Sequence, residues 1–221
     1  MISLRNAPCR SSLGALALTL SLLAPLGCQS AGPPATGSSS RPATTSAPAA
    51  TSAPTAASAP LSITVTSSAF GPNEAVPAKH TCEGTDTSPA LSWSGLPAGT
   101  KSLALIVDDP DAPDPQAPKM VWVHWVLYNI PPDAPGLTEG AGAGELPAGT
   151  KVGQNDWKRA DYGGPCPPIG RHRYFHKLYA LDVQLPDLGK ATKADLDKAM
   201  AGHILARGEL IGTYEKVKSA K

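Results

Sequence analysis

The chain has 221 residues, and its 19 lysines and arginines nearly balance 18 aspartates and glutamates, for a formal net charge of +1. This balance argues against a protein that holds nucleic acid or a membrane surface through bulk charge, so recognition must be local. The 24 prolines and 21 glycines interrupt short apolar runs, and this pattern predicts many turns and little helix.

The N-terminus has the features of an export signal. Two arginines precede residues 13–26, an apolar stretch that is short for a membrane span. A lipoprotein signal peptidase would cut before Cys28, although Pro25 stands where such signals usually have leucine. We therefore predict a signal peptide over residues 1–28 with Cys28 as lipid acceptor, and simple secretion as the alternative. The residue after Cys28 is Gln29 and not the aspartate associated with retention in the inner membrane. By that resemblance we expect an outer-membrane lipoprotein that faces the periplasm.

Residues 29–60 consist almost wholly of alanine, proline, serine, threonine and glycine. Such a composition cannot form a core and predicts a disordered, semi-rigid tether. One domain remains, residues 61–221, which is large enough to fold without a disulfide or a metal ion.

Apolar runs separated by turns dominate this domain. The predicted strands cover residues 61–66, 90–94, 102–107, 121–130, 172–183 and 209–217. A single helical pattern begins at Thr192 and Asp195, which resemble a capping box, and Gly208 can end it. This order predicts an all-β fold, a two-sheet antiparallel β-sandwich with a short C-terminal helix before the last strand.

Four cysteines constrain the mature protein. Cys9 leaves with the signal peptide, and Cys28 is either lipidated or removed. Cys82 and Cys166 then remain in an oxidising compartment, where an exposed free thiol is a liability. We predict a disulfide between them; the alternative is two free or buried thiols.

Familiar enzyme motifs are absent from the sequence. It contains no HExxH or paired CxxC zinc motif, no GxSxG nucleophile motif and no dinucleotide fingerprint after a strand. The glycine-rich residues 140–144 lack the lysine and the following helix of a phosphate-binding loop, so we predict a flexible loop there. What remains is a set of polar residues near the ends of apolar strands: Asp109, Asp111, His124, His172, Arg173 and Tyr174.

Several blocks together resemble the phosphatidylethanolamine-binding protein family, also called Raf kinase inhibitor-like proteins, in its bacterial branch. They include HTCEGTDTSPALSW, SLALIVDDPDAP, WVHWVLYNIP and GPCPPIGRHRY, and the likeness runs from about residue 63 to residue 214. The resemblance implies a β-sandwich with a small surface pocket for phosphate-type head groups. It assigns six residues to that pocket: Asp109, Asp111, His124, Pro167, His172 and Tyr174. Eukaryotic members have two adjacent histidines where this chain has Val123 and His124, which leaves ligand preference open.

The chemistry of these residues suits an anion. Imidazole N–H and phenol O–H groups donate to phosphate oxygens, and an aspartate beside an imidazole, here Asp109, orients the ring. Arg173 points away from His172 along its strand, so we expect it to pair with a carboxylate of the DPDAP turn. For His176 we expect a structural role.

We therefore expect non-catalytic binding of a small anionic ligand, of phosphate type or a phospholipid head group, with no cofactor, metal or nucleic acid. One alternative is a protease inhibitor or protein-interaction module. Another is a hydrolase or a metal-dependent enzyme, which we disfavour because no nucleophile is evident and because His172 and His176 are only a same-face pair on a strand. The expectation requires positions 109, 124 and 172 to converge on one cavity.

Overall fold

The computed structural model describes residues 61–143 and 145–217. The predicted signal peptide, the tether and Cys28 lie outside the described residues, and so do residue 144 and the last four positions. In the described part, no helix has the length and the apolar character that crossing a membrane requires.

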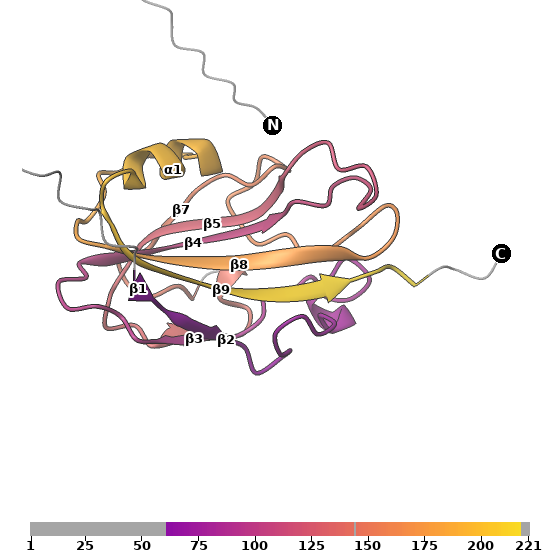
Figure 1. Ribbon diagram of the computed structural model, residues 1–221, viewed down its shortest axis with the longest axis horizontal. Coiled ribbons are helices and arrows are strands. Elements are labelled where there is room, and N and C mark those ends of the chain that lie inside the picture. Colours follow the sequence, from indigo (N-terminus) through magenta and orange to yellow (C-terminus); the bar gives the residue numbers. More distant parts are fainter. Residues whose placement is uncertain (1–60, 144, 218–221) are drawn as a thin grey trace, which may run out of the picture. The chain divides into compact units, whose positions relative to one another are not determined.

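Two sheets form the domain, as predicted (Figure 1). The larger sheet has six strands in the order β1 (Leu61–Ser62), β9 (Ile204–Tyr214), β8 (His172–Leu181), β4 (Ser102–Asp109), β5 (Trp122–Ile130) and β7 (Lys151–Val152). The smaller sheet contains β2 (Thr64–Thr66), β3 (Leu91–Ser94) and β6 (Gly136–Leu137). All pairings are antiparallel except that of β1 with β9. The helices are α1 (Lys193–Met200) and two short 3-10 turns, η1 (Ala78–His80) and η2 (Ala141–Ala143).

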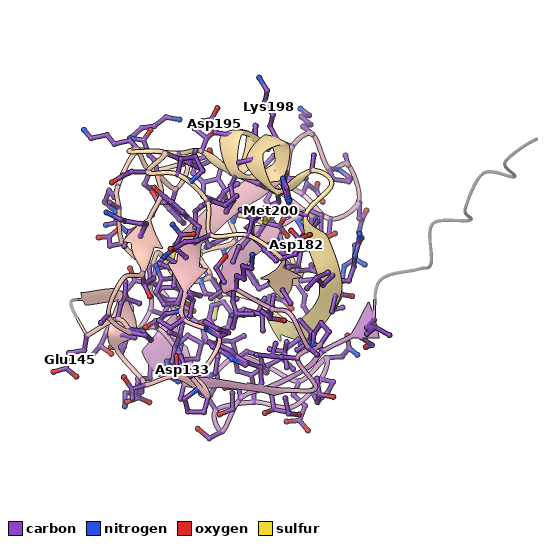
Figure 2. The ribbon with its side chains drawn as sticks, turned by 90° about the vertical axis from the view of Figure 1, so that its left-hand side faces the viewer. Asp133, Glu145, Asp182, Asp195, Lys198 and Met200 are labelled. Carbon is purple, nitrogen blue, oxygen red and sulfur yellow. A yellow bond between two sulfur atoms is a disulfide. The ribbon has the colours of Figure 1, made fainter. Side chains whose placement is uncertain are left out.

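The main core lies between the two sheets. Alternate residues of β8, such as Leu178, face the small sheet, while the central strands β4 and β5 are buried on both faces. Their outer face is covered in part by α1, through Leu196 and Met200. Figure 2 faces this end of the domain, where Lys198 projects outward from the helix. Double-sided burial explains why residues 102–107 form a continuous apolar run rather than an alternating one.

The helix begins as predicted and ends earlier. The Thr192 side chain accepts from the Asp195 backbone N–H and the Asp195 carboxylate accepts from the Thr192 N–H, which completes the capping box. Gly208 does not end the helix but lies within β9, which starts at Ile204 rather than at residue 209. A Cβ on Gly208 would lie 2.0 Å from the backbone oxygen of Ile63. Close approach of two backbones, and not a helix stop, therefore requires glycine at this position.

Antiparallel register brings the predicted site residues together at one end of the central strands of the large sheet. Asp109 at the end of β4 pairs with Trp122 at the start of β5, and Asp108 pairs with Phe175 near the start of β8. Polar residues near the ends of three separate strands therefore become neighbours. In Figure 1 this end lies on the right, where the arrowheads of β4 and β9 point.

A disulfide joins Cys82 and Cys166, which are separated by 84 in the sequence and have their Cα atoms 5.4 Å apart. Cys82 lies in the loop after β2, and Cys166 lies in the segment that leads into β8. The bond therefore fastens together two long segments that lie outside the named strands.

Replacing both cysteines with serine should lower the free energy of unfolding by about 2–4 kcal/mol, because the bond closes a long loop in the unfolded chain. Urea unfolding of wild type and of the Cys82→Ser/Cys166→Ser variant measures the difference. Reduced wild type is the control and should match the variant. Equal stability of all three forms would show that the bond is absent in solution.

Candidate functional site

A pocket of about 390 Å³ opens where β4 ends and where β5 and β8 begin. Five of the six predicted ligand-binding residues line it: Asp109, His124, Pro167, His172 and Tyr174. The three separated stretches around positions 109, 124 and 172 thus converge on one cavity. A larger hollow of about 600 Å³ lies over Lys177, Tyr179 and Arg207, but none of the unpaired buried polar atoms of the described residues belongs to its lining.

Asp109 and His172 form a buried pair at the base of the pocket. The His172 Nδ1 lies 2.7 Å from an Asp109 carboxylate oxygen, and Nε2 lies 3.0 Å from the carbonyl oxygen of Ile169. The other Asp109 oxygen accepts from the backbone N–H of Asp111 at 2.8 Å. Burial raises the pKa of Asp109, against the opposing effect of the hydrogen bond from His172.

The protons of this pair follow from its partners. Because a carbonyl oxygen only accepts, the Nε2 of His172 carries a proton, and one further proton lies between Nδ1 and the Asp109 carboxylate. The pair is then neutral overall, wherever that second proton resides. Both ring nitrogens are engaged within the protein, so His172 contributes a wall to the pocket rather than a free donor.

His124 presents a free acceptor. Its Nδ1 donates to the carbonyl oxygen of Gly163 at 2.6 Å, while its Nε2 is buried and has no partner among the described residues. Burial lowers the pKa of His124 to about 4, although the bond to Gly163 opposes this effect. The ring is therefore neutral at pH 7 with its proton on Nδ1, and Nε2 accepts. The sequence had suggested an N–H donor here; the geometry makes the free atom an acceptor.

Tyr174 presents a free donor. Its hydroxyl is buried and has no partner among the described residues, and burial raises the pKa of the phenol. The ring contacts His124 edge-to-face, with centroids 5.2 Å apart, and stacks on His172 at 6.4 Å. The pocket therefore combines one free O–H donor with one free ring-nitrogen acceptor.

Asp111 lies outside the pocket lining. Its carboxylate accepts hydrogen bonds from the Arg173 side chain, from Nε at 2.9 Å and from Nη2 at 2.7 Å, and from the Arg173 backbone N–H at 2.9 Å. The Arg173 hydrogen bond is the main cause that lowers the pKa of Asp111. This is the ion pair expected for Arg173, and it makes Asp111 a clamp that fixes the turn after β4 onto β8. The structure shows this structural contact for Asp111, and its predicted ligand contact stays a prediction.

An apolar wall that was not predicted from the sequence completes the pocket. Met120, Trp122 and Trp157 line the cavity, and the two indole rings meet edge-to-face with centroids 5.3 Å apart. Trp122 could have been found, because it lies two positions from His124 and so on the same face of β5. Nothing local in the sequence brings Trp157 to this place.

Metal ligands do not gather at this site. Among residues 61–143 and 145–217, no group of three histidines, cysteines, aspartates or glutamates is arranged to hold a metal ion. The Asp109 and His172 side chains are each committed to other protein groups, as described above.

Comparisons with known proteins identify relatives of the whole described domain. The family model for phosphatidylethanolamine-binding protein matches residues 66–215. A UPF0098 protein of Methanothermobacter thermautotrophicus is 48% identical over 155 residues, which are 70% of this chain and 99% of that protein. A UPF0098 protein of Chlamydia muridarum is 45% identical over 152 residues, 69% of this chain and 98% of its own length.

Solved structures show the same architecture. The phosphatidylethanolamine-binding protein homologue CT736 of Chlamydia trachomatis superposes with a TM-score of 0.65 at 43% identity, covering 71% of this chain and 99% of its own. E. coli YbcL gives a TM-score of 0.64 at 36% identity, covering 70% and 99%. Each of these crystallised chains is matched over 99% of its length by about 70% of this chain.

His176 is a second buried histidine, two positions from Tyr174, and it is 2% exposed. Neither ring nitrogen has a hydrogen-bond partner among the described residues, and Phe70 packs against the ring with centroids 5.5 Å apart. Burial lowers the pKa of His176 to about 4, and the nearby backbone of Tyr174 and Leu210 offsets this only in part. The folded protein therefore holds this ring neutral well below the pH at which an unfolded chain would protonate it.

Acid should destabilise the protein through this ring. Between pH 6.5 and pH 4 the unfolded state binds a proton that the folded state does not, so stability is complete above pH 6.5 and falls toward pH 4. A pKa lowered from 6.5 to about 4 corresponds to a loss on the order of 3 kcal/mol. His176→Met should remove this loss, and at pH 7 it should keep or raise stability, because no hydrogen bond is broken.

Urea unfolding at pH 7.5 and pH 4.5 measures the effect. His203→Gln is the matched control, since His203 is exposed and pairs with Asp182 on the surface. The control should keep the acid sensitivity of wild type. An equally steep loss of stability in His176→Met would contradict the assignment.

Proposed function

This chain belongs to the phosphatidylethanolamine-binding protein family, and on that premise we propose that its pocket binds, without catalysis, a small ligand of phosphate type such as a phospholipid head group. One observation carries the proposal. Two buried polar atoms of the pocket, the Tyr174 hydroxyl and the His124 Nε2, have no partner among the described residues. An unsatisfied buried polar group is costly, so a ligand that satisfies both stabilises the folded protein.

The two free atoms define what the ligand must offer. Tyr174 donates, so the ligand needs an acceptor such as a phosphate oxygen; His124 accepts, so the ligand also needs a donor. A singly protonated phosphate supplies both through its P–O and P–OH groups. A phosphoethanolamine head group supplies both through a phosphate oxygen and its ammonium N–H. The neutral Asp109–His172 pair adds no net charge that would favour a fully ionised phosphate.

The pocket lining supports binding rather than hydrolysis. Cys166 is the one cysteine in the lining, and its disulfide bond with Cys82 leaves no free thiol there. The Tyr174 phenol is protonated at neutral pH because burial raises its pKa, and His124 has no hydroxyl or thiol partner to activate. The Asp109 carboxylate is the other nucleophile type in the lining, and it is engaged by His172 and by the backbone N–H of Asp111, which also favours binding over nucleophilic catalysis.

Tyr174→Phe and His124→Ala should each weaken the binding of phosphoethanolamine by about tenfold, which corresponds to about one hydrogen bond. Isothermal titration calorimetry measures the change. Tyr128→Phe is the matched control, because Tyr128 is also buried but bonds to Asp187 and Leu188 away from the pocket. If both pocket variants bound as tightly as wild type, the pocket assignment would be wrong.

The same titrations at two pH values test the role of His124. The second pKa is near 7 for inorganic phosphate in water and near 6 for phosphate esters. Inorganic phosphate should therefore bind more tightly at pH 5.5 than at pH 8, because only the form with a P–OH group can donate to the Nε2 of His124. Glycerophosphoethanolamine should bind alike at both pH values, since its donor is the ammonium group. Glycerophosphocholine has neither P–OH nor N–H and should bind more weakly than glycerophosphoethanolamine.

The location that we propose is the cell envelope, with the domain held at the outer membrane and facing the periplasm through lipid on Cys28. The sequence features of residues 1–28 support it, and a disulfide between Cys82 and Cys166 suits an oxidising compartment. Simple secretion is the alternative.

Mass spectrometry of the mature N-terminus distinguishes the two. A lipoprotein should give an N-terminal peptide that starts at Cys28 and carries the mass of the lipid. A Cys28→Ala variant should lose that modification and be released from the membrane fraction by washing with 0.5 M salt. A mature chain that starts beyond Cys28, or an unmodified Cys28, would exclude the anchor.

A further inference from the structure

Exposed apolar side chains gather around the mouth of the pocket. Six large apolar residues of the described chain are exposed, and four of them surround this opening: Met120, Trp157, Ile169 and Val217, with exposed fractions of 51, 38, 57 and 76%. Met120 and Trp157 line the pocket itself. Ile169 and Val217 line an adjoining groove that shares Pro167 and Pro168 with it. Single exposed apolar residues need no explanation, but a group of them around one cavity marks a contact surface.

A basic residue accompanies each of these four apolar residues within two positions of the sequence: Lys119, Lys158, Arg171 and Lys216. The three lysines form no ion pair with any residue that the structure describes, and Arg171 has Glu215 at 3.8 Å. Each pair of apolar and basic residues lies on a different segment, outside the strands. Four separate segments therefore bring the same combination to one end of the domain.

The acidic residues of this end cancel the charge only in part. Asp109 is buried against His172, and the Asp111 carboxylate is held by Arg173. Glu215 lies 3.8 Å from Arg171, and Glu83 accepts from the backbone N–H of Val217 beside Lys216, so these two carboxylates offset two of the four basic residues. Lys119 and Lys158 form no ion pair with a described residue and leave the mouth with a positive excess, although the whole chain has a formal net charge of only +1. Charge complementarity calls for a partner with negative charge.

The combination of residues also indicates what kind of partner fits. The centre of a protein–protein interface is depleted in lysine. A membrane interface instead favours lysine and arginine at the level of the phosphates, with tryptophan and other apolar side chains just below them. Lysines interleaved with Trp157, Ile169 and Met120 follow the second pattern.

The chain enters the domain far from this mouth. Leu61 of β1 pairs with Ala206 of β9, whereas His172 of the pocket pairs with Tyr214, eight residues further along β9. Eight residues of extended strand span about 26 Å. In Figure 1, β1 lies on the left and the end of β9 on the right. Leu61, the first residue that the structure describes, therefore lies about a strand's length away from the mouth.

We propose that this mouth surface, formed by the four apolar residues and their four basic neighbours, docks the domain onto a bilayer that contains anionic lipid. The apolar side chains enter the interfacial region and the cations lie among the phosphates. Docking goes beyond the proposed function, because it needs no occupied pocket. It presents the opening directly to the layer of lipid head groups.

Flotation with lipid vesicles tests docking on the isolated domain, residues 61–221, because crystallised relatives are matched over 99% of their own length by about 70% of this chain and fold without an equivalent of the rest. Vesicles of phosphatidylcholine with one quarter phosphatidylglycerol should bind the domain, pure phosphatidylcholine should bind it less, and 0.5 M salt should release it. Lys119→Glu/Lys216→Glu should reduce the bound fraction about tenfold or more. Trp157→Ser/Ile169→Ser should do the same at unchanged charge.

Matched controls lie away from the mouth. Leu61→Ser removes an apolar side chain that is 62% exposed, and Lys190→Glu/Lys198→Glu reverses two exposed lysines near α1, where Figure 2 shows Lys198 projecting outward. Each should bind vesicles better than its mouth counterpart. Variants of the mouth that bind vesicles no less than these controls would overturn the proposal. So would an absence of vesicle binding together with a dimer in light scattering that the mouth variants dissociate.

Failure of docking and failure of head-group binding are separate outcomes. The Lys119→Glu/Lys216→Glu variant should still bind soluble phosphoethanolamine in the calorimeter, because neither lysine lines the pocket. Tyr174→Phe should still float with anionic vesicles, since the buried hydroxyl is not part of the mouth surface. Loss of flotation in Tyr174→Phe would mean that the pocket alone holds the membrane, and docking as proposed would be wrong.

Discussion

The buried contact between the Asp109 carboxylate and the His172 ring joins the end of β4 to the start of β8, and the pocket depends on it. Strand pairing brings the two residues to the same end of the central strands, but the hydrogen bonds fix their side chains. Asp111 and Arg173 repeat the connection one step outward, with the ion pair on the opposite face of β8. The contacts of Asp109 and Asp111 thus hold the same turn, and the base of the pocket is polar without carrying an unpaired charge.

This arrangement explains why His124 and Tyr174 are left for the ligand. Asp109 and His172 satisfy each other and nearby backbone groups, so they offer the cavity shape and little else. The His124 ring is fixed at Nδ1 by Gly163, which leaves the opposite nitrogen free. The recognition that we propose therefore depends on one donor and one acceptor in a largely apolar enclosure, where each hydrogen bond counts for more than it would in water.

Much of this architecture could be predicted from the sequence, because it rests on local patterns. The apolar runs of β4 and β5, the capping box at Thr192 and the residue types near strand ends are all short-range signals. The ion pair of Arg173 with the turn after β4 was predictable from strand alternation, but the protonation of His124 and His172 was not, because it depends on backbone carbonyls of irregular segments, those of Gly163 and Ile169. The same holds for Trp157, which reaches the pocket from a loop, and for Gly208, whose place in β9 is decided by the backbone of Ile63.

The separation between the two ends of the domain has a practical consequence for handling the protein. A label, affinity tag or surface linkage placed before Leu61 is carried on the side where β1 joins β9, a strand's length from the cavity. One placed at the C-terminus follows closely after Val217, which borders the groove beside the opening. Immobilisation through the N-terminal side therefore leaves the cavity accessible, whereas a bulky C-terminal fusion would crowd it.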